Sequence, residues 1–218
     1  KKFYQIRKYI IKIIYAVKDF NYYHAGSIIG SFPISAYPPS YYILSEEEKK
    51  IFQQDVERQK EELQILRHLE RLRPEWNQVL DGADKWLYKT TKENYHHICN
   101  EFHEMYGLLS IHKEEWKNIG EQLLMFFVYT YFCGAVYDDM VCSKMELALF
   151  SARWIQEFLI VRWLENGKKL FMKDVEEISW RYAREVEHSD ENLNTLEDWL
   201  FEKYAPKGCI NTDGCDIL

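Results

Sequence analysis

The sequence predicts an all-α protein, and three features support this fold class. Apolar residues recur at mixed intervals of three and four along much of the chain, which is the period of an α-helix. These stretches are separated by short segments rich in Gly, Pro, Asn and Asp, which interrupt helices. No alternating run typical of a β-strand occurs. We expect an orthogonal or antiparallel bundle of about seven to eight helices.

The stretch 123–163 is the most apolar part of the chain, and we expect the other helices to pack around it. Residues 123–137 carry no charge, and the acidic turn Asp138-Asp139 separates them from a second apolar helix. Helices that are apolar around most of their circumference must be covered on several sides, so the two are predicted to form a central antiparallel hairpin. A membrane span is the competing interpretation. The uncharged run is shorter than the roughly 20 residues that a bilayer requires, and Gly134 interrupts it, so no membrane is expected.

The first part of the chain is predicted to hold two helices and a loop. An amphipathic helix covers residues 3–19, and a Gly-, Pro- and Tyr-rich loop at 21–44 is a candidate boundary between lobes. Ser45 and Glu48 fit a capping box, which starts a long charged helix that reaches Arg73.

The remaining helices follow from local signals. A short helix at 75–88 is expected to break at Asp81-Gly82. Thr90 with Glu93 is expected to cap the next helix, which ends at Gly107. The first arm of the hairpin is expected to begin at His112 or Lys113. The last two helices are predicted at 173–188 and 191–204, with Ser189-Asp190 as the second cap. The residues of the first of these two helices that are expected to face inward are Val175, Ile178, Tyr182 and Val186. Residues 1–204 are expected to form a single helical domain, and 205–218 a loose tail.

Composition narrows the class of protein. The 218 residues carry a formal net charge of -7, with Lys and Arg interleaved among acids, so no nucleic-acid partner is expected. Five cysteines without framework spacing, and no signal peptide, indicate a cytoplasmic, reduced protein. The chain begins with Lys1-Lys2 rather than Met, which indicates a piece of a longer protein.

Several constellations could bind metal. Two Glu-x-x-His pairs at helical spacing resemble those of di-iron carboxylate bundles, which also need carboxylates from two other helices. The candidate ligands are Glu93, His96, Glu146, Glu185 and His188. Weaker patterns are His96, Cys99 and His103 on one helix face, and Cys209 with Cys215 in the tail. Against these, ordinary surface histidines are the simpler interpretation. Phosphate-binding glycine loops and hydrolase elbows are absent from the sequence.

One stretch resembles a known family. The segment Tyr182-Ala-Arg184-Glu185-Val-Glu187-His188-Ser189-Asp-Glu191-Asn192-Leu193 is similar to the C-terminal signature of the flagellin lysine-N-methylase family. The segment from Gly134 to Asp139, followed by Lys144 and an apolar helix, is similar to the preceding hairpin of that family, and the opening residues 3–11 resemble the start of its middle region. The resemblance covers roughly half of the chain.

The resemblance implies a bacterial enzyme that transfers methyl groups from S-adenosylmethionine to lysine side chains of flagellin. It also implies an iron–sulfur cluster in a cysteine-rich N-terminal region, whose motif none of the five cysteines of this chain matches. Two other classes remain open from the residues alone: a di-iron carboxylate bundle, and a non-catalytic helical module that binds a protein partner.

A lysine methylase must remove a proton from the substrate ammonium and hold the neutral amine in line with the methyl group. Tyr182, Arg184, Glu185 and His188 are the candidate catalytic residues, because Tyr182, Glu185 and His188 recur along one helix and could line a pocket. Glu185 or His188 would deprotonate or orient the amine. The alternative is a hydrogen-bond network of Arg184, Glu185, His188 and Asn192 that only fixes the last two helices.

Overall fold

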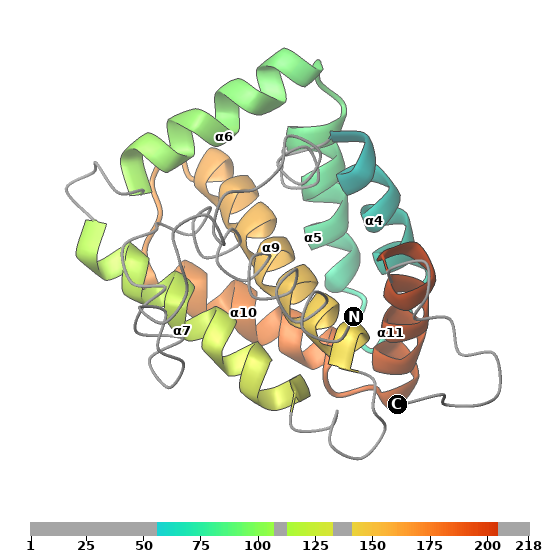
Figure 1. Ribbon diagram of the computed structural model, residues 1–218. Coiled ribbons are helices and arrows are strands. Elements are labelled where there is room, and N and C mark those ends of the chain that lie inside the picture. The colour runs from blue at the N-terminus through green and yellow to red at the C-terminus, as the bar shows by residue number, and fades with distance from the viewer. Residues whose placement is uncertain (1–55, 107–112, 133–140, 205–218) are drawn as a thin grey trace, which may run out of the picture.

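Every regular element in the computed structural model, which describes residues 56–106, 113–132 and 141–204, is a helix (Figure 1). The elements in these ranges are α4 (Val56–His68), α5 (Trp76–Ala83), the π-helix η3 (Asp84–Tyr88), α6 (Lys92–Tyr106), α7 (Lys113–Phe132), α9 (Val141–Glu165), α10 (Met172–Val186) and α11 (Asp190–Tyr204). The predicted all-α fold class is thereby confirmed. Outside the described residues lie the expected helix at 3–19, the loop at 21–44, the cap at Ser45, Gly107, the turn Asp138-Asp139 and the tail.

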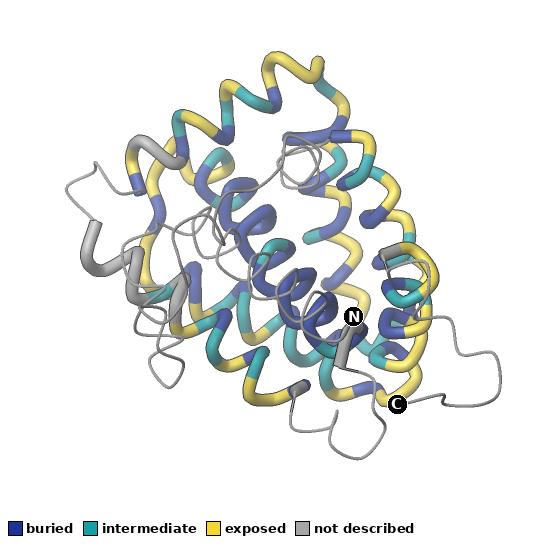
Figure 2. The backbone as a smooth tube through the Cα atoms, viewed as in Figure 1, coloured by how far each residue is buried: buried dark blue, intermediate teal, exposed yellow. Residues whose placement is uncertain are grey.

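Helix α9 is the centre of the bundle. It contacts α5, η3, α7, α10 and α11, and Figure 2 shows it as the most continuously buried helix. Large side chains such as Trp154, Phe158 and Trp163 are almost fully buried along its length. Burying an apolar side chain of this size contributes roughly 1.5–3 kcal/mol, so α9 supplies much of the shared core.

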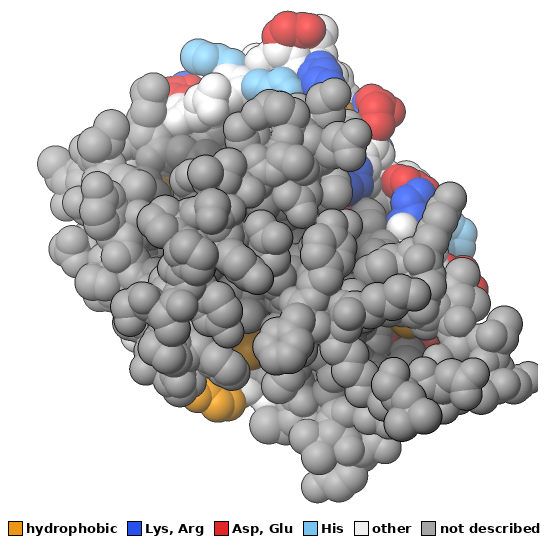
Figure 3. Space-filling model, in the orientation of Figure 1, with side chains coloured by type: hydrophobic (Ala, Val, Ile, Leu, Met, Phe, Trp, Pro, Cys, Tyr) orange, Lys and Arg blue, Asp and Glu red, His pale blue; other side chains and the backbone are white. Residues whose placement is uncertain are grey.

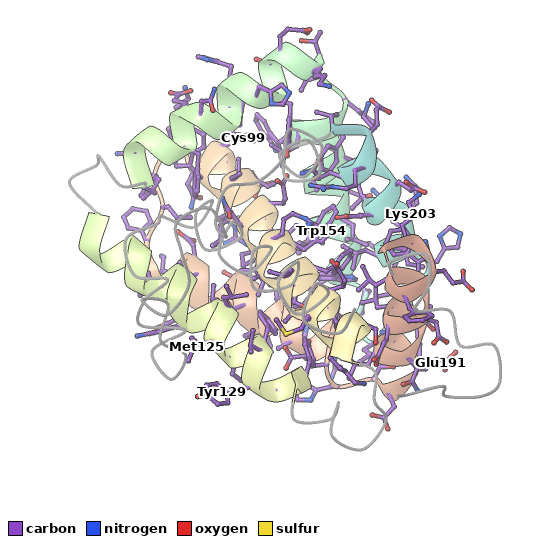
Figure 4. All side chains as sticks on the ribbon, viewed as in Figure 1. Cys99, Met125, Tyr129, Trp154, Glu191 and Lys203 are labelled. Carbon is purple, nitrogen blue, oxygen red and sulfur yellow. The ribbon has the colours of Figure 1, made fainter. Side chains whose placement is uncertain are left out.

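Helix α7 lies beside α9 and runs in the opposite direction, as the hairpin prediction requires (Figure 1). The expectation that both arms are covered on several sides holds only for α9. On α7, Leu124 and Phe127 face the core, whereas Phe126 and Tyr129 are 51% and 65% exposed. Tyr129 projects away from the bundle in Figure 4. The absence of charge in the second half of α7, from residue 123 onward, therefore did not mean that this part of the helix is buried all round.

The end of α4 differs from its predicted position. The helix ends at His68 rather than near Arg73, because the Arg71 side chain folds back onto the last turn. Its guanidinium donates hydrogen bonds to the carbonyl oxygens of Leu66 at 3.0 Å and Leu69 at 3.2 Å, and also to that of Arg67. These carbonyl groups have no partner within a helix that stops here, so the arginine caps the helix end.

The predicted break at Asp81-Gly82 is wrong. Helix α5 runs through both residues to Ala83 and continues directly into the π-helix η3. A Cβ atom at Gly82 would lie 3.0 Å from Cγ1 of Val161 on α9. The glycine therefore serves the close approach of two helices, which explains its presence inside a helix.

Two further caps can be compared with their predictions. Helix α6 is capped by Thr91, not Thr90, because Thr91 Oγ1 accepts from the Asn94 backbone N–H at 3.2 Å. Helix α11 begins as predicted, since Ser189 Oγ accepts from the Asn192 N–H at 3.2 Å. Both bonds satisfy N–H groups that an α-helix leaves unpaired in its first turn.

Helix α10 has the predicted amphipathic pattern. The four residues expected to face inward are all buried: Val175, Ile178, Tyr182 and Val186. At the start of α10, Asp174 Oδ2 accepts from the Phe171 N–H at 2.9 Å and thereby caps the helix. The turn before α10 places Gly167 and Lys168 in the left-handed region, with φ of 65° and 66°.

The surface carries charges of both signs. Along the upper edge in Figure 3, over α6, acidic, basic and histidine side chains are interspersed. Within the three described ranges, none of the helices combines the length and the apolar character that crossing a membrane requires.

Candidate functional site

The candidate catalytic residues lie at the end of α10 and in the turn that leads to α11. Tyr182 points into the core, where its hydroxyl donates to Ser151 Oγ at 2.9 Å. Ser151 in turn donates to the Leu147 carbonyl oxygen at 2.8 Å. The ring of Tyr182 packs edge-on against Trp76 and Phe127. Burial raises the pKa of Tyr182 above its ordinary value, so the phenol stays protonated and acts as a hydrogen-bond donor.

Glu185 binds the backbone of the turn between α4 and α5. Its side chain is 2% exposed, and Oε2 accepts from the backbone N–H groups of Leu72 at 3.1 Å and Arg73 at 3.3 Å. These two residues form the turn between α4 and α5. Glu185 therefore fixes that turn against the end of α10, because a buried N–H group without a partner is costly.

Arg184 is half-buried and His188 is exposed. The guanidinium of Arg184 lies 4.2 Å from the ring centroid of Trp180, which is 57% exposed. His188 is exposed, and its backbone N–H donates to the Ala183 carbonyl oxygen at 3.2 Å just beyond the end of α10. Of the four candidates, these two have side chains that are in contact with solvent, whereas Tyr182 and Glu185 are buried.

A polar network joins the end of α10 to α11 and to the α4 end. Nδ2 of Asn192 donates to the carbonyl oxygens of Glu185 at 2.6 Å and Glu70 at 3.0 Å, and Oδ1 accepts from the Glu70 N–H at 2.7 Å. Ser189 Oγ donates to Glu70 Oε2 at 3.2 Å. Glu185 and Asn192 thus belong to a helix-end network, as the alternative interpretation proposed, while Tyr182 and His188 point elsewhere.

The structure adds Tyr131 and Glu187, which sequence analysis did not select. Tyr131 on α7 is 6% exposed, and its phenol interacts electrostatically with Glu187 and Tyr182. Both the Tyr131 hydroxyl and Glu187 Oε1 are buried, and a side-chain hydrogen-bond interaction joins the two groups. Burial raises the pKa of both groups above their ordinary values. Glu187 lies in the family-like segment, but nothing in the apolar stretch around Tyr131 distinguishes that tyrosine from its neighbours.

A second buried carboxylate lies between η3, α6 and α9. Glu157 accepts from the hydroxyls of Tyr88 and Tyr95, each at 2.9 Å, and is 2% exposed. Burial is the largest influence on this group and raises its pKa. The nearby thiol of Cys99 is also buried with a raised pKa, which makes it a poor nucleophile. In Figure 4, Cys99 lies beneath α6 and Trp154 lies between α9 and α5.

The candidate metal ligands are spread over separate elements. Glu93 is exposed at the start of α6, His96 is half-buried on the same helix, and Glu146 is buried on α9. Glu185 is already bound to two N–H groups, and His188 is exposed. Among the described residues, no group of three or more His, Cys, Asp or Glu side chains is arranged to hold a metal ion. Nothing is described of the His103 side chain, and Cys209 and Cys215 lie outside the described ranges.

Together these features define the class of protein: an α-helical domain around one long buried helix, closed by a polar network that ties its last two helices to α4. The family model for the FliB lysine N-methylase C-terminal domain matches residues 18–207. The chain belongs to this family, which confirms the resemblance seen in its C-terminal segment. Neither the curated proteins nor the solved structures contain a match.

Proposed function

We propose that this chain is part of a lysine N-methyltransferase that acts on flagellin and uses S-adenosylmethionine as the methyl donor. The observation that carries the proposal is the family match over residues 18–207, which includes every residue that the structure describes. Methylation of a protein side chain fits a domain in which the candidate residue His188 is exposed and Arg184 is partly exposed.

Within this function, the candidate residues take different roles. His188 is exposed and lies beside Glu187, with which it interacts electrostatically, so we assign it the role of proton acceptor from the substrate amine. Arg184, stacked on the exposed Trp180, is assigned to substrate contact. Tyr182 and Glu185 are positioning residues, because each is buried and bonded to other parts of the domain.

The cofactors follow from the same proposal. S-adenosylmethionine supplies the methyl group when it is bound. The cysteines of this chain do not fit an iron–sulfur cluster: Cys99 is buried, and the other four are spaced far from a cluster motif. We therefore assign any cluster to the N-terminal region of the family. We also propose that flagellin methylation takes place in the cytoplasm.

The test is a methylation assay with purified full-length protein, purified flagellin and S-adenosylmethionine carrying a labelled methyl group. We expect label on flagellin lysines, identified by mass spectrometry. Flagellin that stays unlabelled would contradict the proposal. Binding of flagellin without labelling would indicate an interaction module instead, and two tightly bound irons per chain would indicate a di-iron bundle.

His188→Ala tests the assigned role of His188, with His97→Ala as the matched control because His97 is also an exposed histidine. We expect His188→Ala to lower kcat about a hundredfold without changing the melting temperature. His97→Ala should retain the activity of the wild type. Equal activity of both variants would remove His188 from the reaction.

A further inference from the structure

Three exposed apolar side chains lie where the end of α6 meets the start of α10. Phe171 is 52% exposed, Met172 40% and Met105 37%. Glu101 and Met105 are four residues apart on α6 and share a helix face, and Glu101 forms an ion pair with Lys168 in the turn before α10. Met105 therefore lies on the side of α6 that faces this turn. We define the α6–α10 patch as Met105, Lys168, Lys169, Phe171, Met172 and Lys173.

Hydrogen bonds fix the backbone beneath this patch. The Lys168 N–H donates to the Trp163 carbonyl oxygen at 2.8 Å and closes the end of α9. The Leu170 N–H donates to the Tyr106 hydroxyl at 2.8 Å, where the connection from α9 to α10 passes the end of α6 (Figure 1). Leu170 is buried, so it anchors the turn in the core while the neighbouring Phe171 extends into solvent. A surface that is already ordered loses little conformational entropy when a partner binds.

The patch carries positive charge, although the whole chain has a formal net charge of -7. Lys169 and Lys173 are exposed, and neither forms an ion pair within the described part of the chain. The ammonium of Lys173 lies 5.9 Å from the ring centroid of Phe171. Asp174 is buried and accepts from the Phe171 N–H, and Glu176 lies about one turn further along α10. The patch therefore offers two ammonium groups beside an exposed aromatic ring.

We propose that the α6–α10 patch is a docking surface for an acidic segment of a partner protein, whose carboxylates pair with Lys169 and Lys173. An apolar side chain of the same segment packs against Phe171, Met172 and Met105. Methionine side chains adapt to apolar partners of different shapes, and aromatic residues often anchor protein interfaces. This interaction goes beyond the proposed methylation, whose candidate residues lie at the other end of α10.

An anionic membrane surface has related chemistry, but the charges favour a protein segment. Polybasic segments that bind anionic lipids contain about four to eight Lys or Arg residues, whereas this patch has two unpaired lysines. The net charge of -7 also opposes the approach of the chain to an extended anionic surface. A short acidic segment contacts the patch alone, so the remaining negative charges of the chain lie further away and are screened by salt.

The test uses a short fluorescent peptide in which Glu and Asp flank a central Leu-Phe pair. Fluorescence anisotropy measures its binding to the full-length protein. One control peptide has Lys and Arg in place of the acidic residues, and a second has Ser in place of both Leu and Phe. We expect the acidic, apolar peptide to bind about tenfold more tightly than either control peptide, and added salt to weaken its binding.

Two substitutions in the patch have matched controls. Phe171→Ser should weaken peptide binding about tenfold, whereas Phe126→Ser, which changes a phenylalanine of nearly equal exposure on α7, should not weaken it. Lys173→Glu should weaken binding about fivefold, whereas Lys92→Glu, which also lies in the first turn of a helix, should leave it unchanged. Serine is favoured before a helix and an acidic residue in its first turn, so Phe171→Ser and Lys173→Glu should retain the melting temperature.

Three outcomes would overturn the proposal. The docking surface is wrong if the peptide does not bind, or binds equally to wild type and Phe171→Ser. Binding of the protein to phosphatidylserine vesicles but not to the peptide would make the patch a lipid-binding surface. A wild-type dimer in size-exclusion chromatography that Phe171→Ser dissociates would make a second copy of the chain the occupant. None of these measurements reads methylation, so their failure leaves the proposed function unaffected.

Discussion

The side chain of Asn192 and the backbone of Glu70 are joined by two hydrogen bonds, and each residue donates one and accepts the other. The Glu70 N–H donates to Asn192 Oδ1 at 2.7 Å, and Asn192 Nδ2 donates to the Glu70 carbonyl oxygen at 3.0 Å. The two residues are 122 positions apart in the sequence. An asparagine amide offers both a donor and an acceptor, so one side chain fixes the end of α4 against the start of α11.

Asn192→Ala should therefore destabilise the domain. It removes both bonds to Glu70 and the bond to the Glu185 carbonyl oxygen, and we expect the free energy of unfolding to fall by about 2–4 kcal/mol. Urea denaturation followed by circular dichroism measures the change. Asn194→Ala, an exposed asparagine on the same helix, should change it by less than about 0.5 kcal/mol. Equal effects of the two variants would show that the network contributes nothing to stability.

The contact between Gly82 and Val161 predicts a dependence between two substitutions. Gly82→Ala alone should lower the free energy of unfolding by about 1 kcal/mol, because its new methyl group would lie 3.0 Å from Cγ1 of Val161. In a Val161→Ala background the same change should raise it by up to about 1 kcal/mol, since alanine is the better helix former. A double-mutant cycle by urea denaturation measures the coupling. Purely additive effects would contradict a steric role for Gly82.

Glu157 predicts a dependence of stability on pH. Its pKa is raised in the folded state, chiefly by burial, so the folded protein binds a proton more tightly than the unfolded chain does. The stability that this group contributes is complete below its ordinary pKa and is lost as the pH rises through the raised pKa. Glu157→Gln cannot ionise, so we expect the variant to gain stability relative to wild type as the pH rises above the ordinary range of a glutamate carboxyl group.

The comparison must account for the groups that face Glu157. Tyr88 and Tyr95 donate to it, Arg153 favours its charged form, and Glu62 opposes it. Glutamine can accept from one tyrosine and donate to the other, so the geometry is retained. The exposed Glu176→Gln variant should show a difference from wild type that does not vary with pH. If the stability difference between Glu157→Gln and wild type also does not vary with pH, folding does not raise the pKa of Glu157.

Tyr182→Phe distinguishes a positioning residue from a catalytic one. The variant loses the hydrogen bond to Ser151, and we expect the free energy of unfolding to fall by about 1 kcal/mol. Flagellin methylation below the melting temperature should stay within about threefold of wild type, because Tyr182 is buried in the core and is assigned a positioning role. Tyr129→Phe, an exposed control, should change neither quantity. A much larger loss of kcat in Tyr182→Phe would place its hydroxyl in the reaction.

The features that sequence analysis predicted correctly depend on local patterns. The spacing of Val175, Ile178, Tyr182 and Val186 determines which face of α10 is buried, and a serine before an acidic turn determines where α11 begins. Both signals operate within a few residues. The position of α9 at the centre was also predictable, because apolar residues occur on nearly all of its sides.

The features that sequence analysis missed depend on partners far away in the chain. Glu185 binds two backbone N–H groups, which every residue except proline carries, so no side chain marks Leu72 and Arg73 as its partners. From the sequence alone, Gly82 was expected to break the helix. The Val161 side chain that leaves no room for a larger residue at this position belongs to another helix, so no local pattern indicates it. The pairing of Tyr131 with Glu187 likewise requires the packing of α7 against α10, which periodicity alone does not determine.

The π-helix η3 also has a consequence for how this segment can vary. The Lys89 N–H donates to the Asp84 carbonyl oxygen at 2.9 Å, five residues back, so the turn holds one residue more than an α-helical turn. Deleting one residue between Asp84 and Tyr88 would close this wide turn and change which side chains of the segment face α9. Tyr88 would then no longer be placed to donate to the Glu157 carboxylate, and α6 would lose its contacts with α9. Homologous chains should accordingly exchange residue types here while keeping the segment length constant.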